Sequence, residues 1–218
     1  MAQVSERGNL PGLRDVDLVE SCMKAPLARA GMRIGLLGGS FDPPHKGHLH
    51  ISLQAIKRLQ LDQLWWLVSP GNPLKQDGPW PLHKRLRQCL ELADHPKLKI
   101  TALETALGSP YTAKTLTFLT RRFPATKFVW LMGADNMASV DLWRDWQKIF
   151  EAVPVAALDR PGQRYGVSSS LAARVFRKNR IKEQFASSLV GKQAPAWTSL
   201  TMPLSYESST RIRQKHRS

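Results

Sequence analysis

The sequence is poor in the features that mark secreted, membrane and metal-rich proteins. Its two cysteines, Cys22 and Cys89, are too few for a disulfide framework or a cysteine zinc site, and they suit a reducing compartment. No uncharged apolar run approaches the roughly 18 residues that a membrane-spanning helix needs. The first residues show no charged stretch followed by an apolar one and a small-residue cleavage site. We therefore expect a cytoplasmic protein that has no membrane partner.

Acidic side chains are scarce as well, since 17 Asp and Glu accompany 32 Lys and Arg and leave a net charge of +15. The imbalance is concentrated in residues 160–218, which carry twelve basic and two acidic side chains. Such an excess is typical of proteins that bind polyanions, and nucleic acid is the first partner to consider. However, no nucleic-acid-binding module is recognisable, and the tryptophans fall mostly in apolar runs. Nucleic-acid binding is therefore kept only as a distant alternative.

Short apolar runs alternate with helical patterns along most of the chain. In the helical patterns apolar side chains recur at spacings of three and four, as at Leu49, Leu53 and Ile56. Apolar strands that alternate with amphipathic helices are typical of a parallel sheet covered on both faces. We predict an α/β fold with a doubly wound parallel sheet. The predicted strands are 33–37, 63–69, 97–103, 127–132 and 153–158, and the predicted helices are 49–59, 82–93, 116–123 and the basic segment 174–182.

The chain length of 218 residues suits one ordinary domain. Residues 1–31 differ from the rest, because their charges are mixed and only Leu13, Val16 and Val19 hint at a helical period. We predict that 1–31 form a flexible N-terminal extension outside the core and that 32–218 form the domain. Met32, where the apolar pattern begins, is also a candidate alternative translation start.

The segment after the first predicted strand carries the strongest chemical signal. Ligands of open parallel sheets bind beyond the carboxyl ends of the strands. Here two glycines allow a close backbone approach, and two histidines follow where a helix begins, so imidazoles, free amides and the positive helix end converge. This arrangement suits a polyphosphate, although it matches neither the Walker loop nor the dinucleotide glycine fingerprint. The segment reads Gly38-Gly39-Ser40-Phe41-Asp42-Pro43-Pro44-His45-Lys46-Gly47-His48.

A zinc site is the competing interpretation of the histidines. His45 and His48 are three residues apart, but the remaining nearby candidate, His50, falls two positions further along the helix and points elsewhere. We therefore interpret His50 as structural and predict no metal ligand from the protein.

The same segment resembles the signature of the nucleotidylyltransferase superfamily, whose hallmark is His/Thr-x-Gly-His and whose fold is Rossmann-like. Three further motifs, in the expected order, are similar to those of the bacterial nicotinate-nucleotide adenylyltransferase family, and together the four cover residues 32–213. They are Gly133-Ala134-Asp135 followed by Trp143, then Arg160-Pro161-Gly162, and finally Ser208-Ser209-Thr210-Arg211-Ile212-Arg213.

The resemblance implies transfer of AMP from ATP to nicotinate mononucleotide, which gives deamido-NAD and pyrophosphate in NAD biosynthesis. The attacking phosphate is already ionised, so positioning and electrostatic stabilisation suffice and no general base is needed. A Mg²⁺ ion is expected with ATP, held mostly by phosphate oxygens and water.

The family's roles carry over onto matching positions. His45 and His48 would be catalytic and hold the triphosphate. The resemblance assigns Gly38, Gly39, Ser40, Phe41, Gly133, Asp135, Ser208, Ser209, Thr210 and Arg213 to ATP, and Lys75, Arg85, Tyr111, Thr112 and Trp143 to the mononucleotide. Simpler interpretations remain open: helix capping for Asp135 and the serines, core packing for Trp143, and surface charge for Lys75 and Arg85.

The chain departs from the family pattern at Pro110, Lys114 and Leu74, where serine, aspartate and histidine are common. All three lie on the mononucleotide side, so they leave the adenylyl-transfer motifs intact. The alternative within the superfamily is an adenylyltransferase for nicotinamide mononucleotide or phosphopantetheine. Acid and amide nucleotides differ by one small group, and main-chain donors that discriminate between them leave no trace in a sequence.

Overall fold

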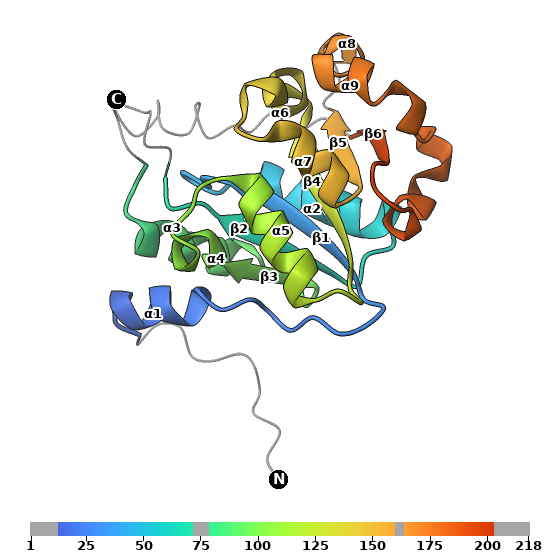
Figure 1. Cartoon of the computed structure of the whole chain (residues 1–218). Coiled ribbons are helices and arrows are strands. Elements are labelled where there is room, and N and C mark those ends of the chain that lie inside the picture. The colour runs from blue at the N-terminus through green and yellow to red at the C-terminus, as the bar shows by residue number, and fades with distance from the viewer. Residues whose placement is uncertain (1–12, 72–78, 160–163, 203–218) are drawn as a thin grey trace.

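A computed structural model describes residues 13–71, 79–159 and 164–202, and these form one six-stranded sheet whose strands are all parallel (Figure 1). The strand order is β3-β2-β1-β4-β5-β6, so the chain winds outward in one direction from β1 and in the other from β4. The predicted doubly wound α/β fold is confirmed. The strands are β1 (Arg33–Gly39), β2 (Gln63–Val68), β3 (Leu98–Thr101), β4 (Lys127–Gly133), β5 (Val155–Asp159) and β6 (Trp197–Thr201).

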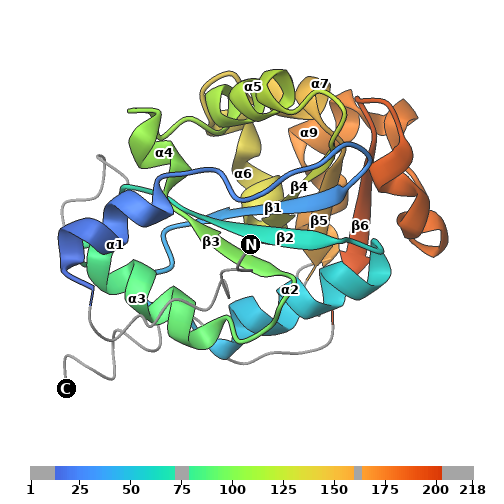
Figure 2. The same ribbon diagram turned by 90° about the horizontal axis from the view of Figure 1, so that it is seen from below.

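Helices cover both faces of this sheet, as Figure 2 shows. One face carries α1 (Asp15–Cys22), α2 (Lys46–Arg58) and α3 (Leu82–Leu92), and the other carries α5 (Thr112–Arg122), α6 (Ala134–Ser139), α7 (Trp146–Ala152) and α9 (Leu171–Val175). The remaining helical elements are α4 (Leu103–Ala106), α8 (Arg164–Ser169), η2 (Val140–Leu142), η3 (Arg177–Asn179) and η4 (Glu183–Gly191). None of the helices in the described part of the chain has the length and apolar character to span a membrane.

Each face of the sheet has its own buried core. Successive strand residues point to opposite faces, so Leu36 and Trp130 pack into one core while Leu37 and Leu131 pack into the other. Because both faces are covered, neither half of the alternation needs to be polar. This explains why the strands read as continuous apolar runs in the sequence.

The N-terminal segment differs from the expectation, because residues 13–31 do not lie outside the core. In α1 the side chains of Leu18, 1% exposed, and Cys22 belong to the core beneath the sheet. The periodicity seen in the sequence followed the wrong face of the helix, since Leu13 and Val16 are exposed. A single pair of buried residues four apart is too short a pattern to reveal the docked face.

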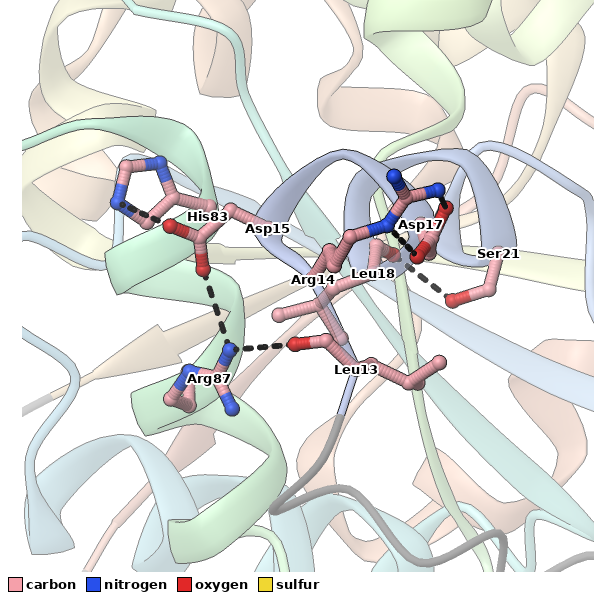
Figure 3. Close-up of polar contacts among 8 residues, drawn as sticks. All are labelled: Leu13, Arg14, Asp15, Asp17, Leu18, Ser21, His83 and Arg87. Atoms are coloured by element: carbon pink, nitrogen blue, oxygen red, sulfur yellow. Dashed lines mark hydrogen bonds and ion pairs between the residues drawn. The ribbon is translucent and has the colours of Figure 1, made fainter.

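Polar contacts also fix α1 to its neighbours. The Asp15 carboxylate lies 3.1 Å from an Arg87 nitrogen and 3.5 Å from a His83 nitrogen, both on α3 (Figure 3). The carbonyl of Cys22 accepts hydrogen bonds from the Ala102 N–H at 2.7 Å and the Thr101 hydroxyl at 2.9 Å. Helix α1 therefore covers the outer part of the sheet beside β3.

Two further elements differ from the sequence prediction. Strand β6 was not predicted, because it is an edge strand whose polar residues interrupt the apolar run. The basic segment 174–182 is not one helix: α9 ends at Val175, a short 3₁₀ turn follows, and Arg180 is extended and forms a bridge with Trp197 of β6.

Candidate functional site

Two of the four motifs, those that contain Gly38 and Gly133, meet at the carboxyl ends of β1 and β4, the two strands at which the winding direction reverses. Ligands of doubly wound sheets bind at this switch point. The motifs at 160–162 and 208–213 lie outside the described residues. The register pairs Leu37 with Leu131, which places Gly38 and Gly39 next to the end of β4 at Gly133.

Packing explains the glycine at position 38, because a Cβ there would overlap the buried indole of Trp130. Among the described residues, a Cβ on Gly133 would meet only the carboxylate of Asp135, an exposed side chain that can rotate away. A Cβ on Gly39 would come within 3.2 Å of the Phe41 ring. The absence of a Cβ at Gly38 and Gly39 therefore lets Trp130 and Phe41 pack closely against the end of β1.

Packed aromatic side chains hold the loop that follows β1. Phe41 is buried, and its ring stacks on Trp66 with 4.9 Å between centroids, while a second contact of 4.9 Å joins it to the His48 ring. The Trp66 indole N–H donates to the Ser52 hydroxyl at 2.8 Å, and Ser52 in turn donates to the His48 carbonyl at 2.7 Å. These contacts with β2 and with its own helix thus hold His48 in place.

The two histidines form a pair at the start of α2. Their ring centroids are 3.9 Å apart, and His45 is only 5% exposed. The His45 main-chain N–H donates to Nδ1 of His48 at 3.2 Å, and the His48 N–H donates to the His45 carbonyl at 2.8 Å. Because Nδ1 of His48 accepts a hydrogen bond, a proton on the neutral ring sits on Nε2, where it can be donated to an anion. The positive end of a 13-residue helix reinforces this preference for negative charge.

Arg85 does not lie where it could contact the mononucleotide, although the sequence predicts such a contact. The side chain is fully buried, and it donates four hydrogen bonds to main-chain carbonyls: to Trp80 at 2.7 Å, Ser40 at 2.6 Å, Ser69 at 2.8 Å and Pro70 at 3.1 Å. A guanidinium whose donors are committed to the protein and hidden from solvent cannot receive a substrate phosphate. The expectation of a direct substrate contact is therefore corrected.

Three of the residues expected to bind the mononucleotide, Tyr111, Thr112 and Trp143, lie on the other face of the sheet. Tyr111 is the N-cap of α5 and is 36% exposed, and Thr112 begins that helix. Arg144, which directly follows Trp143, lies with its guanidinium carbon 5.0 Å from the centre of the Tyr111 ring, so these segments are neighbours. Trp146 belongs to the core, whereas Trp143 only packs against it and keeps part of its surface free. The structure thus distinguishes Trp143, which keeps accessible surface, from Trp146, which belongs to the core.

A buried carboxyl group lies directly before the Tyr111 segment. Glu104, 4% exposed, accepts a hydrogen bond from the Thr115 hydroxyl at 3.3 Å, and its main-chain carbonyl accepts from the Ser109 N–H at 3.3 Å. Removal from water raises the pKa of Glu104 to about 7, and the hydrogen bond from Thr115 offsets only part of this effect. This group supports the turn that leads to Tyr111.

Five of the predicted residues lie outside the described part of the chain: Lys75, Ser208, Ser209, Thr210 and Arg213. Sequence reasoning also missed residues that shape the site, namely Ser52, Trp66 and Trp80. Only Ser52 left a signal, since it is four residues after His48 and so shares its helix face. Among the described residues there is no group of three or more His, Cys, Asp or Glu side chains placed to hold a metal ion.

Comparison with known proteins places this geometry in a family. The cytidylyltransferase-like family model matches residues 36–215. A probable nicotinate-nucleotide adenylyltransferase of Ruegeria sp. (strain TM1040) is 48% identical over 84% of this chain and 97% of that protein, and one of Methylorubrum extorquens (strain PA1) is 49% identical over 84% of this chain and all of that protein. The solved structure of Plasmodium falciparum nicotinic acid mononucleotide adenylyltransferase complexed with NaAD superimposes with a TM-score of 0.62 at 18% identity, covering 83% of this chain and 82% of that one. This last likeness concerns the fold.

Proposed function

The chain belongs to the cytidylyltransferase-like family and, within it, to the nicotinate-nucleotide adenylyltransferases, and on this premise we propose that it transfers AMP from ATP to nicotinate mononucleotide. The products are deamido-NAD and pyrophosphate, which makes the reaction a step of NAD biosynthesis. The observation that carries the proposal is the His45–His48 pair at the start of α2, beside the glycines that end β1.

The reaction is an in-line displacement at the α-phosphorus of ATP. A phosphate oxygen of the mononucleotide attacks while pyrophosphate leaves, so negative charge builds up on the oxygens around the transferring phosphorus. The Nε2 proton of His48, the His45 ring and the amides at the start of α2 stabilise that charge. The attacking oxygen is ionised already. No carboxylate is needed as a base, and the two buried ones nearby are engaged, Asp42 with the Trp80 N–H and Glu104 with Thr115.

The Mg²⁺ ion expected with ATP would be held mainly by ATP itself and not by a set of protein ligands. Mg²⁺ prefers oxygen ligands and keeps several waters, and Asp135 is an exposed carboxylate at the end of β4. We assign to Asp135 the ribose hydroxyls of ATP. The ion itself supplies charge neutralisation of the phosphates.

On the acceptor side, Trp143 stacks on the pyridine ring, and Tyr111 and Thr112 line the same site. Lys75 contacts the phosphate of the mononucleotide, and on the ATP side Ser208, Ser209, Thr210 and Arg213 contact the phosphates of ATP. Support for a cytoplasmic location comes from Cys22 and Cys89, both of which are free thiols inside the protein.

The test is pyrophosphate release from magnesium-ATP by the purified protein, with nicotinate mononucleotide, nicotinamide mononucleotide and phosphopantetheine compared in parallel. We expect the acid nucleotide to give the highest kcat/KM. Preference for either of the others would keep the superfamily and the mechanism but overturn the substrate. Release with none of the three would overturn the proposed activity.

A further inference from the structure

Arg85 is a buried cation that the proposed mechanism does not use. It lies on α3, fully removed from solvent, and each of its four hydrogen bonds to the described residues ends on a carbonyl oxygen of the main chain. Burial lowers the pKa of this guanidinium, and the nearby Asp42 carboxylate opposes that shift. Hiding a charge is costly, and a well-packed apolar side chain would fill the same volume at lower cost. An arginine at this position therefore points to a task other than filling space.

The positions of the four carbonyl groups in the fold indicate what that task is. Ser40 follows β1, Ser69 and Pro70 follow β2, and Trp80 lies two residues before the start of α3. All of them lie near the carboxyl ends of the strands, where the candidate site is. A planar fork with five N–H donors is the side chain that can reach carbonyls from several directions at once. Lysine offers three donors from a single point and cannot reproduce this set.

A second contact strengthens the same junction. The Asp42 carboxylate accepts the Trp80 N–H at 3.1 Å, while Arg85 Nε donates to the Trp80 carbonyl. Both polar groups of the Trp80 main chain are therefore hydrogen-bonded: the N–H to Asp42 in the loop after β1, and the carbonyl to Arg85. The loop after β1 and the entry to α3 are held as one unit.

The bond to Ser40 also orients the next amide. In a trans peptide the C=O and the following N–H point in opposite directions. Holding the Ser40 carbonyl toward Arg85 thus turns the Phe41 N–H away from Arg85. No hydrogen bond from this N–H is found within residues 13–71, 79–159 and 164–202, so it is available to a ligand. Phe41 has a φ of 47°, a left-handed conformation that is strained for a bulky residue and needs surrounding contacts to persist.

We propose that Arg85 is a positioning residue for adenylyl transfer: it fixes the Ser40–Phe41 peptide, and through it the loop that ends at His45, so that an amide and the histidine pair face the same phosphate. The inference rests on the proposed function for its kinetic test, but its binding test needs only ATP. It assigns Arg85 a role through the loop, without contact to either substrate.

The experiment compares the wild-type protein with R85K, R85Q and the control R87K. Arg87 lies on the same helix and contacts Asp15, away from the site. Circular dichroism and the melting temperature establish which proteins are folded under the assay conditions. Equilibrium dialysis then gives the Kd for ATP, and steady-state kinetics give kcat and the two KM values. In folded R85K we expect a several-fold higher Kd and KM for ATP and a kcat lower by about a hundredfold, the typical cost of a 1 Å misplacement of reacting groups. R87K should match the wild type.

Arg85 variants that are folded but retain the wild-type Kd and kcat would overturn the proposal, because a merely structural role lowers the melting temperature alone. Insolubility of both R85K and R85Q would overturn it too, since Arg85 would then be a requirement of folding. If the wild type binds ATP but transfers nothing to the mononucleotide, the proposed function fails. A weakened ATP Kd in R85K would still uphold the role of Arg85 in that case.

Discussion

At the residue scale, His48 both caps α2 and presents Nε2 to a ligand, since its Nδ1 accepts the His45 N–H at 3.2 Å. His48→Ala should therefore lower kcat by about 10²–10³, the usual effect of removing one donor to a developing charge. Loss of the cap should cost roughly 1 kcal/mol of unfolding free energy. His50→Gln, on the same helix, is the control and should retain full activity. Normal turnover in His48→Ala would remove this residue from the catalytic pair.

Trp143 and Trp146 form a second matched pair, because one keeps free surface and the other is 9% exposed in the core. We expect Trp143→Ala to raise the KM for the mononucleotide and to change the melting temperature little. Trp146→Ala should instead lower the unfolding free energy by roughly 3–5 kcal/mol, since a large cavity replaces its indole. Kinetics and denaturant titration on both variants separate the two effects. A Trp143→Ala protein with normal KM and reduced stability would reverse the assignment.

Glu104 makes stability depend on pH. Burial raises its pKa from 4.5 to about 7, so the folded state favours the protonated carboxyl more strongly than the unfolded state does. Its contribution is therefore complete below pH 4.5 and is lost as the pH rises to 7. Compared with Glu104→Gln, which cannot ionise, the wild type should lose about 3 kcal/mol of unfolding free energy over this window. Urea titrations of both proteins at pH 5 and pH 8 test this, and an equal difference at the two values would contradict it.

At the scale of elements, α1 should contribute to stability through Leu18. Leu18→Ala should lower the unfolding free energy by about 3 kcal/mol, because it empties a site in the core beneath the sheet. Val16→Ala, on the exposed face of the same helix, should change it by less than about 0.5 kcal/mol. A chain that began at Met32 would lack α1 and should be destabilised more than Leu18→Ala. Equal effects of the two substitutions would show that α1 does not pack as described.

The same scale shows which elements a sequence reveals. Strands β1, β2 and β4 were predicted because they are buried on both faces and read as unbroken apolar runs. Helix α1 and strand β6 were missed because each buries only part of its surface and is held by long-range contacts. For β6, Arg58 donates to the Thr201 carbonyl at 2.7 Å and to the Glu183 carboxylate at 2.6 Å. Such contacts join residues more than a hundred positions apart and leave no local pattern.

At the scale of the whole molecule, the net charge of +15 predicts attraction to any polyanion. We expect the protein to shift duplex DNA at 50 mM salt and to lose this binding at 200 mM, because binding through about six phosphate contacts weakens on the order of a thousandfold over that range. Gel-shift assays at both salt concentrations check this. Tight binding at 200 mM, or binding to one sequence over another, would revive nucleic acid as a functional partner.

The sequence by itself determined the fold class, the loop after β1 and the pairing of His45 with His48. These depend on short-range patterns: apolar periodicity, glycines at a strand end, and two histidines three apart at a helix start. It also identified the family, since four motifs in order are themselves a linear property of the chain.

The tertiary structure alone decided what the ambiguous side chains do. The sequence predicts a substrate contact or surface charge for Arg85, whereas in the structure it is buried and joins three separate segments through the carbonyls of Ser40, Ser69 and Trp80. Glu104 becomes a group that titrates near neutrality because burial, which no local pattern reports, removes it from water. Charge and polarity are properties of a residue, but their energetic consequences depend on which parts of the chain exclude solvent around it.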